Sequence, residues 1–314
     1  MVDVELVVSH AYSTGMAIAM QSDEYDGGSP HRPHDPMAVE VSGTTTVGED
    51  ALVSGKKSVG RWLAIVSLCF WWPGVIAAQG NFEIQVYGSD TMEPGKTMFE
   101  LHSNTAIRGT TTREEGVFPT QHAVHETIEI TRGFTPWFET GFYIFTSIQP
   151  DAGWKWVGDH IRPRVRVPES WHVPVGLSLS TEIGYQQRSF STDTWTVEIR
   201  PILDKQWGSW YASFNPVFDR SLKGEGTNRG FAFSPNAKLS YAILPKVSAG
   251  LEYYGGLGPV TAFDPLRKQQ HLLFPVLDLD FGPQWECNVG VGIGLTPETD
   301  RLLVKLILGY RFPW

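Results

Sequence analysis

Four basic side chains occupy alternate positions in one short stretch of this 314-residue chain. His160, Arg162, Arg164 and Arg166 are separated by residues that are apolar or proline. Successive side chains of a β-strand point to opposite faces, so an extended stretch would carry all four basic groups on one face. A basic row on the inner wall of a channel attracts anions and acts as a selectivity element. These four residues are therefore candidates for lining a lumen.

A second interpretation of the same row is an internal network of salt bridges that fills a narrow barrel. Acidic side chains alternate with apolar ones in several other stretches, and the inward acids are at least as numerous as the inward bases. Charges paired in this way are unavailable to a passing solute. Both interpretations are open at this point. The candidate lumen-lining set therefore also includes Glu182, Glu198, Arg200, Asp278, Asp280 and Glu286.

A serine beside a histidine raises the possibility of a membrane-embedded hydrolase. The candidate is His102-Ser103-Asn104, but strand alternation would send Ser103 outward and His102 inward, so the two could not act as nucleophile and base. His122 and His125 are three residues apart, an odd offset that also divides them between faces and disfavours a metal site. The sequence predicts no catalytic residue, no metal and no cofactor.

Three glycines alternate near the C-terminus, at Gly290, Gly292 and Gly294. They resemble a phosphate-binding loop only superficially, because no helix follows them. On the inward face of a strand, glycine reduces crowding or permits the strand to coil. We expect them to make room inside a barrel.

The elements that must position these residues are strands, because apolar and polar residues alternate from about residue 96 onward. Segments of about ten to fourteen residues with this period, separated by turn residues, are typical of transmembrane barrel strands. An even count suits a single-chain outer-membrane barrel. The sequence therefore predicts an all-β fold, a transmembrane antiparallel up-and-down β-barrel of about twelve strands, at residues 96–107, 122–132, 137–148, 157–167, 173–187, 192–203, 209–219, 230–243, 246–256, 269–281, 284–295 and 301–312.

The connections support this topology. Those after the second, fourth, sixth, eighth and tenth predicted strands are compact, whereas those after the first, seventh and ninth are long. Short periplasmic turns and longer outer loops are expected of such barrels. Tryptophans near the compact turns would form an interfacial girdle: Trp137, Trp171, Trp207, Trp285 and Trp314.

The last predicted strand resembles the C-terminal strand that outer-membrane barrels present to their assembly machinery. It alternates apolar residues and ends in Tyr310, Phe312 and Trp314, although Pro313 and Trp314 extend beyond the usual terminal aromatic. By its general layout, without a diagnostic motif, residues 81–314 also resemble the phenol-degradation MetA-type outer-membrane family. That resemblance implies channel-like transport, including transport of aromatic compounds.

A secretory signal peptide is predicted at residues 56–80. A basic cluster that includes Lys56 and Arg61 precedes an apolar run too short to span a membrane, and small residues follow at Ala77 and Ala78. We expect the mature protein to begin between Ala78 and Asn81. Residues 1–55 are expected to be a disordered extension from a mis-assigned start, and residues 81–314 to be the barrel.

Charge and composition exclude a nucleic-acid partner. The formal charge is −9, and residues 1–55 carry nine acids and one base, which leaves −1 for the rest. Such a chain has no basic footprint for nucleic acid. We expect a monomer in the bacterial outer membrane, in contact with its lipid and with the assembly machinery. The expected function is a channel or transporter for a small solute. The candidate solute classes are aromatic compounds and organic anions. The alternatives are a lipid-modifying enzyme and a closed structural or adhesive barrel that acts through its outer loops.

Overall fold

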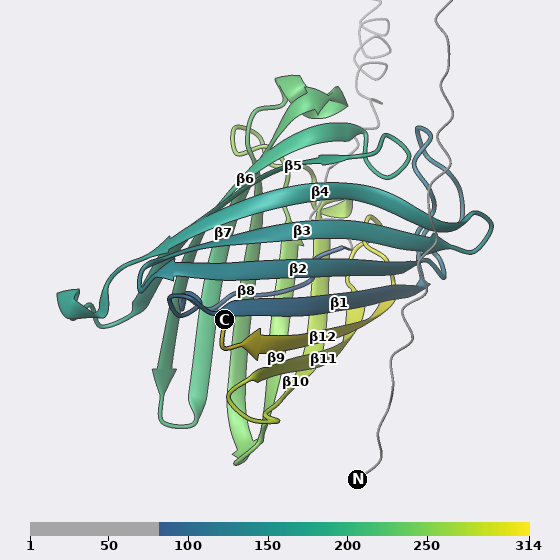
Figure 1. The fold of residues 1–314 in the computed structure, drawn as a ribbon. Helices are drawn as coiled ribbons and strands as arrows, with labels where there is room; N and C mark the ends of the chain where they lie inside the picture. The colour runs from purple at the N-terminus through teal and green to yellow at the C-terminus, as the bar shows by residue number, and fades with distance from the viewer. Residues whose placement is uncertain (1–81) are drawn as a thin grey trace, which may run out of the picture. The chain divides into compact units, whose positions relative to one another are not determined.

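The computed structural model describes residues 82–314, and these form one closed barrel of twelve antiparallel strands (Figure 1). Each strand pairs with its neighbours in sequence, and β1 pairs with β12 to close the sheet. The strands are β1 (Thr97–Arg108), β2 (Val124–Thr135), β3 (Phe138–Gln149), β4 (Gly153–Arg166), β5 (Gly176–Gln186), β6 (Asp193–Trp207), β7 (Trp210–Gly224), β8 (Ala232–Leu244), β9 (Val247–Gly256), β10 (Gln270–Leu279), β11 (Trp285–Gly294) and β12 (Leu302–Phe312).

The predicted fold class and strand count are confirmed. Three short 3₁₀ helices lie between strands: η1 (Glu169–Trp171), η2 (Glu225–Asn228) and η3 (Leu266–Lys268). Within residues 82–314, no helix is long and apolar enough to cross a membrane. The predicted extension at residues 1–55 and the predicted signal peptide at residues 56–80 both lie outside the described residues.

The outer face of the barrel is apolar, as the alternation of the sequence requires. Large apolar side chains that point outward remain exposed on many strands, whereas the residues between them are buried in the interior. A soluble protein rarely exposes so extensive an apolar surface, because it would drive association. The surface therefore matches the hydrocarbon of a bilayer. Representative residues are Phe99, Leu101, Ile128, Phe142, Ile161, Leu179, Ile183, Leu251, Leu277, Val291 and Val304.

Several strands extend further than the sequence predicts, and β7 and β4 are two of them. β7 continues to Gly224 rather than to residue 219, and it pairs with β6 up to Asp193. β4 begins at Gly153 rather than at residue 157, and an irregularity opposite Phe145 and Thr146 accommodates Val157. Backbone hydrogen bonds can continue beyond the apolar band, because the ladder does not depend on side-chain polarity. Apolar alternation therefore marks the part of a strand in lipid better than it marks the strand's end.

The glycines of β11 make room for an aromatic ring inside the barrel. A Cβ atom at Gly292 would lie 2.3 Å from Cζ of Phe274, and one at Gly290 would lie 2.8 Å from Val276 Cγ1. Phe274 is fully buried on β10, beside β11. The expectation that these glycines reduce crowding inside the barrel agrees with this geometry.

Candidate functional site

The interior of the barrel holds a segment of its own chain. Residues 82–92 precede β1 and have no strand pairing, yet the side chains from Phe82 to Tyr87 are buried. The segment contacts β1 and β2 at the loop end, where Asn104 and Thr127 donate hydrogen bonds to Phe82 O at 3.3 and 2.7 Å. It reaches the opposite end of the barrel at Met92, whose N–H bonds to Glu139 Oε2 at 2.5 Å. We call residues 82–92 the inner segment.

Polar side chains of the wall satisfy the backbone of the inner segment. Asn215 on β7 binds Tyr87 from both sides, since its Oδ1 accepts from Tyr87 N at 2.8 Å and its Nδ2 donates to Tyr87 O at 3.0 Å. Ser213 donates to the same carbonyl at 2.6 Å, and Lys305 donates to Ile84 O at 3.0 Å. Buried backbone groups need such partners, and an extended chain outside the sheet cannot find them in a ladder. The inner segment is therefore held by side-chain hydrogen bonds.

The two faces of the inner segment contact different walls. Ile84 and Val86 belong to an apolar cluster whose other members come from β1, β9, β10 and β12: Ala106, Tyr254, Leu272, Phe274, Val276 and Leu303. Glu83 and Tyr87, on the alternate positions, contact charged side chains instead. The lumen is therefore partly apolar on the β9–β12 side, because the apolar half of the inner segment is buried there.

Arg162 lies at the centre of a buried charge network. Its guanidinium forms ion pairs with Glu129 on β2 and, at 3.1 Å, with Glu139 on β3. Its Nε also donates to the Tyr143 hydroxyl at 2.5 Å. Arg164 adds a second ion pair to Glu139 at 2.5 Å. Since all of these groups are buried, each charge depends on its partners for the stabilisation that water would otherwise supply.

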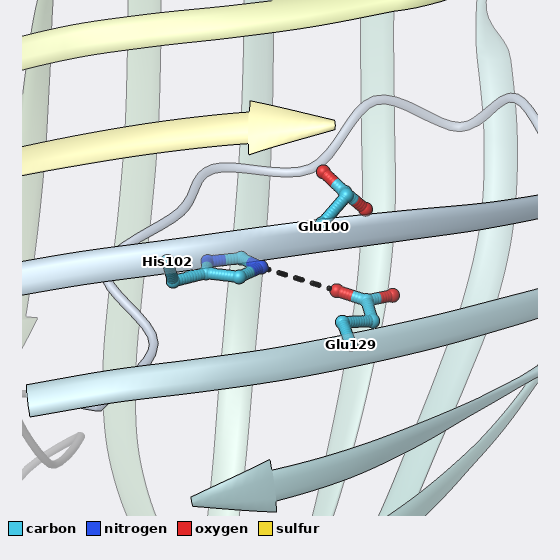
Figure 2. Close-up of side chains that lie close together, drawn as sticks. All are labelled: Glu100, His102 and Glu129. Atoms are coloured by element: carbon cyan, nitrogen blue, oxygen red, sulfur yellow. Dashed lines mark ion pairs between the residues drawn. The ribbon is translucent and has the colours of Figure 1, made fainter. Parts of the chain in front are cut away.

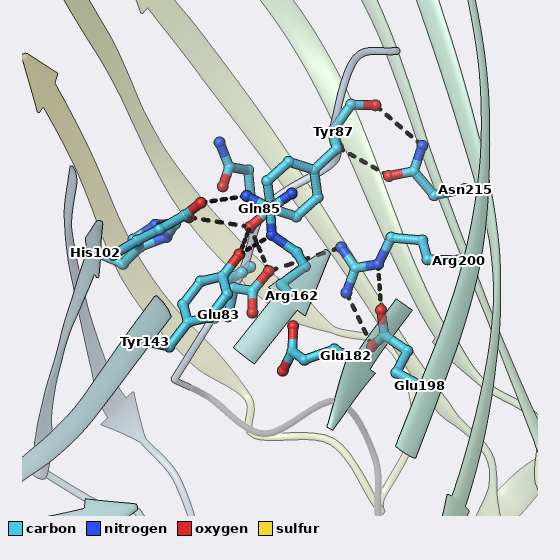
Figure 3. Close-up of polar contacts among 12 residues, drawn as sticks. Glu83, Gln85, Tyr87, His102, Tyr143, Arg162, Glu182, Glu198, Arg200 and Asn215 are labelled. Atoms are coloured by element: carbon cyan, nitrogen blue, oxygen red, sulfur yellow. Dashed lines mark hydrogen bonds and ion pairs between the residues drawn. The ribbon is translucent and has the colours of Figure 1, made fainter. Parts of the chain in front are cut away.

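The ring of Tyr87 connects the inner segment to this charge network (Figure 3). The guanidinium carbons of Arg162, Arg164 and Arg200 lie 5.1, 5.6 and 5.0 Å from the centre of this ring. Cations within about 6 Å of an aromatic face are attracted by the ring's quadrupole. Arg164 also donates to Gly88 O at 3.2 Å. The basic row of β4 therefore binds the inner segment as well as the wall.

The remaining predicted lumen residues are distributed over separate pairs. His160 Nδ1 lies 2.5 Å from Glu182 Oε1, and Arg200 Nε lies 2.6 Å from Glu198 Oε1. Arg166, near the turn end, pairs with the exposed side chains of Asp90 and Glu169. Of the two interpretations of the basic row, the salt-bridge network describes Arg162 and Arg164, although their partners are Glu129 and Glu139.

The predicted acidic lumen residues Asp278 and Glu286 also form separate ion pairs. Asp278 pairs with Lys238 at 2.7 Å, and Glu286 pairs with Arg311 at 2.7 Å. Asp280 lies just after the end of β10 at Leu279 and is exposed in the following turn. Its Oδ1 accepts from Gly282 N at 2.7 Å, which stabilises that turn. The predicted strand therefore extends past the observed end of β10 at Leu279, and a lumen role for Asp280 stays a prediction.

A second buried charge network is centred on a residue that the sequence analysis did not select as a candidate, Glu252. Glu252 on β9 pairs with Lys305 on β12 and, at 3.2 Å, with Lys238 on β8. All three occupy polar positions of the alternating pattern, so the sequence predicted that their side chains point inward. The sequence did not predict their ion pairs, because β8 and β12 are far apart along the chain. Their lysines reach the same carboxylate only once the barrel closes.

The aromatic residues of the C-terminal strand form a continuous outer ladder. The ring centres of Tyr310 and Phe312 are 4.7 Å apart, and those of Phe312 and Trp314 are 5.1 Å apart. Trp285 and Phe99, on the two neighbouring strands, add contacts of 4.8 and 5.5 Å. This arrangement places the predicted assembly residues on the lipid-facing side, and their recognition by the assembly machinery stays a prediction.

One cluster has ligand types suited to a metal, Glu100 and His102 on β1 with Glu129 on β2 (Figure 2). Their ligand atoms lie within 4.8 Å of one another, and His102 Nε2 is 3.3 Å from Glu129 Oε2. Glu129 already neutralises Arg162, and a metal ion would have to compete with that guanidinium. Ser103 lies on the other face, where its hydroxyl donates to Glu126, so it is not paired with His102 as a nucleophile.

A chamber of about 380 Å³ lies at the loop end of the lumen. Its floor includes Phe82 and Glu83 of the inner segment, and its sides include residues from the loops after β1, β5 and β11. The wall between floor and loops carries several of the predicted lumen residues, namely His160, Glu182, Glu198 and Arg200. The chamber is therefore lined by the inner segment, by inward residues of the barrel wall and by the loops.

These features define the class of protein. A closed antiparallel barrel with an even number of strands, an apolar exterior, aromatic side chains near the turns and a polar interior is the architecture of outer-membrane proteins. The chain is a β-barrel of the bacterial outer membrane.

Solved structures that resemble this chain include three outer-membrane proteins. The COG4313 outer membrane channel from Pseudomonas putida F1 matches with a TM-score of 0.48 and 11% identity over 73% of this chain and 100% of that one. The KdgM porin in complex with disordered oligogalacturonate matches with a TM-score of 0.41 and 10% identity over 69% and 99%. Omp33 of Acinetobacter baumannii matches with a TM-score of 0.39 and 11% identity over 72% and 100%.

No protein-family model matches the chain, and a search of the curated proteins found no match either.

Proposed function

We propose that the protein is a narrow channel or transporter for small solutes, and that the inner segment controls passage through it. The observation that carries this proposal is the chamber at the loop end, which has a polar wall and a floor made by the chain itself. A solute that enters from the loops would meet the inner segment before any other barrier.

Passage requires the inner segment to move. Around Tyr87 the lumen is filled, since Tyr87, Tyr143, Arg162 and Glu139 are all buried. The inner segment is held by hydrogen bonds and ion pairs, whereas each strand is held by a ladder on both sides. Segments with few ladder hydrogen bonds open at lower free energy than the core of a fold. Release of the segment is therefore the step we expect to limit flux.

Liposome swelling tests this function directly. Wild-type protein would be compared with a variant that lacks residues 82–88, across sugars, phenols and organic anions. We expect slow swelling with wild type and faster swelling with the variant, because the deletion removes the floor of the chamber. Phenols are included because the chain resembles the MetA-type family. No swelling with either protein would contradict a channel.

A closed structural barrel is the second candidate, and the filled lumen around Tyr87 is the observation that favours it. It predicts no flux for wild type and equally little for the deletion variant, provided that both are folded. An enzyme acting on lipid would instead release fatty acid from the same liposomes, which thin-layer chromatography would detect.

A further inference from the structure

Three carboxylates form a row across the wall of the chamber. In the strand register, Glu182 on β5 lies directly opposite Glu198 on β6, and Glu198 lies directly opposite Asp219 on β7. All three line the chamber. Like charges directly opposite each other on neighbouring strands are destabilising. We call these three residues the carboxylate row, and it is a place where added positive charge is favoured.

The cations already present do not satisfy the row. Arg200 binds both oxygens of Glu198, with its Nε at 2.6 Å and its Nη2 at 3.0 Å. His160 Nδ1 lies 2.5 Å from one oxygen of Glu182, and Asp219 accepts a hydrogen bond from the Ser234 hydroxyl at 2.9 Å. One guanidinium and one imidazole thus serve three carboxylates.

One oxygen of the row is buried without a hydrogen-bond partner. Glu182 is only 8% exposed, yet its Oε2 has none among the described residues, and neither does Nε2 of the neighbouring His160. Both residues line the chamber. A buried polar group without a hydrogen-bond partner destabilises the fold, and a charged group does so more strongly. A ligand that donates to Glu182 Oε2 would remove that penalty.

The rest of the chamber suits an organic ligand. Its volume of about 380 Å³ is within the range of small-molecule sites, about 300–1,000 Å³. Aromatic rings from the inner segment, β3 and the β5–β6 loop line it, namely Phe82, Phe145 and Phe190. Three more acids, Glu114, Glu298 and Asp300, line it from the loops. A cleft with this charge concentrates cations at its mouth.

We propose that the chamber binds a small organic cation, an amine carried on an aromatic or other apolar body. Its ammonium group would lie on the carboxylate row and donate to Glu182 Oε2, and its body would contact the aromatic rings, where a cation is further favoured. A bare divalent ion fits less well, because Ca²⁺ takes six to eight oxygens and Arg200 already occupies both oxygens of Glu198. The inference names the solute class of the channel proposed above and rests on that function for its physiological meaning.

Isothermal titration of the full-length barrel in detergent tests this binding. The probes are 2-phenylethylamine, its neutral counterpart 2-phenylethanol, and calcium chloride, all at low ionic strength. We expect the amine to bind at least tenfold more tightly than the alcohol, since the alcohol lacks the charge that the row favours. Equal affinities for amine and alcohol would overturn the inference, and so would calcium binding without amine binding.

Variants locate the site. Glu182→Gln should weaken amine binding by about tenfold or more, because it removes the unpaired carboxylate oxygen. Glu169→Gln is the matched control, since Glu169 is exposed at the turn end and its replacement should leave affinity unchanged. Phe190→Ala should weaken the amine several-fold through loss of ring contact. If Glu182→Gln does not fold, Asp219→Asn takes its place. Identical affinities in the row variant and the Glu169 control would refute the site.

The outcome is separable from that of the channel experiment. Binding is measured in detergent and needs no flux, so amine binding that depends on Glu182 would stand even if liposomes did not swell. Swelling with neutral solutes but no amine binding would leave the channel intact and reject the cation site.

Discussion

Arg164 and Arg166 occupy successive inward positions of one strand, but their surroundings differ. Arg164 is buried against Glu139, whereas Arg166 pairs with Asp90 and Glu169, whose side chains are 86% and 85% exposed. An ion pair whose carboxylate is exposed to solvent contributes at most about 1 kcal/mol, whereas breaking a buried pair costs about 3–5 kcal/mol. The same basic residue type therefore has two roles on one strand.

Arg164→Glu should destabilise the barrel by about 3 kcal/mol or more, because it places a second carboxylate beside buried Glu139. The ion selectivity of any conductance should change little, since Arg164 is tied into the network. Arg166→Glu is the matched control and should lower stability by no more than about 1 kcal/mol. Thermal unfolding and reversal potentials in planar bilayers measure the two effects. A shift toward cations in Arg164→Glu without loss of stability would instead support an open anion pathway.

At the scale of elements, the inner segment is the part of the lumen that we expect to move most easily, because side-chain hydrogen bonds hold it in place of a strand ladder. Asn215 makes two hydrogen bonds to Tyr87, so Asn215→Ala would leave a buried N–H unsatisfied and weaken the hold on the adjoining carbonyl. We expect more frequent channel openings in planar bilayers, with little change in the melting of the barrel. Thr194→Ala, which removes a hydrogen bond to Lys223 O away from the inner segment, should not alter gating. Unchanged openings in Asn215→Ala would show that the segment does not limit conductance.

The packing of Phe274 on β10 against β11 depends on the lack of a side chain at Gly292. Gly292→Ala would place a methyl group 2.3 Å from the Phe274 ring, and we expect a loss of about 1–3 kcal/mol through overpacking. Phe274→Leu in the same chain should restore part of that loss, because it shortens the side chain that clashes. Denaturant unfolding of the two single variants and the double variant measures this coupling. Additive effects would mean that the ring and the glycine do not compete for space.

At the scale of the whole molecule, closure of β1 on β12 leaves no free strand edge. A closed hydrogen-bond circuit in detergent resists disruption until it is heated. Unheated protein should therefore migrate differently from boiled protein on a denaturing gel, and its circular dichroism spectrum should be that of β-structure. A helical spectrum, or identical migration before and after boiling, would be incompatible with this barrel.

The class and the strand count followed from the sequence alone, because both depend on local patterns. A period of two fixes which side chains face lipid, as Ile161 and Leu179 do, and turn residues mark most strand ends. The inward direction of Arg162 and Arg164 was predicted for the same reason. The inner segment also alternates, with Ile84 and Val86 against Glu83 and Tyr87, but alternation alone does not indicate that an extended segment lies inside a barrel.

Tertiary structure decided which inward charges meet. Glu129 and Glu139 are the partners of Arg162 because β2, β3 and β4 are adjacent, and Lys238 and Lys305 share Glu252 because the sheet closes on itself. A pattern along one strand gives the face of a residue and carries no information on strand tilt or on what fills the centre. The inner segment fills that centre at Tyr87, and it leaves the carboxylate row facing the chamber.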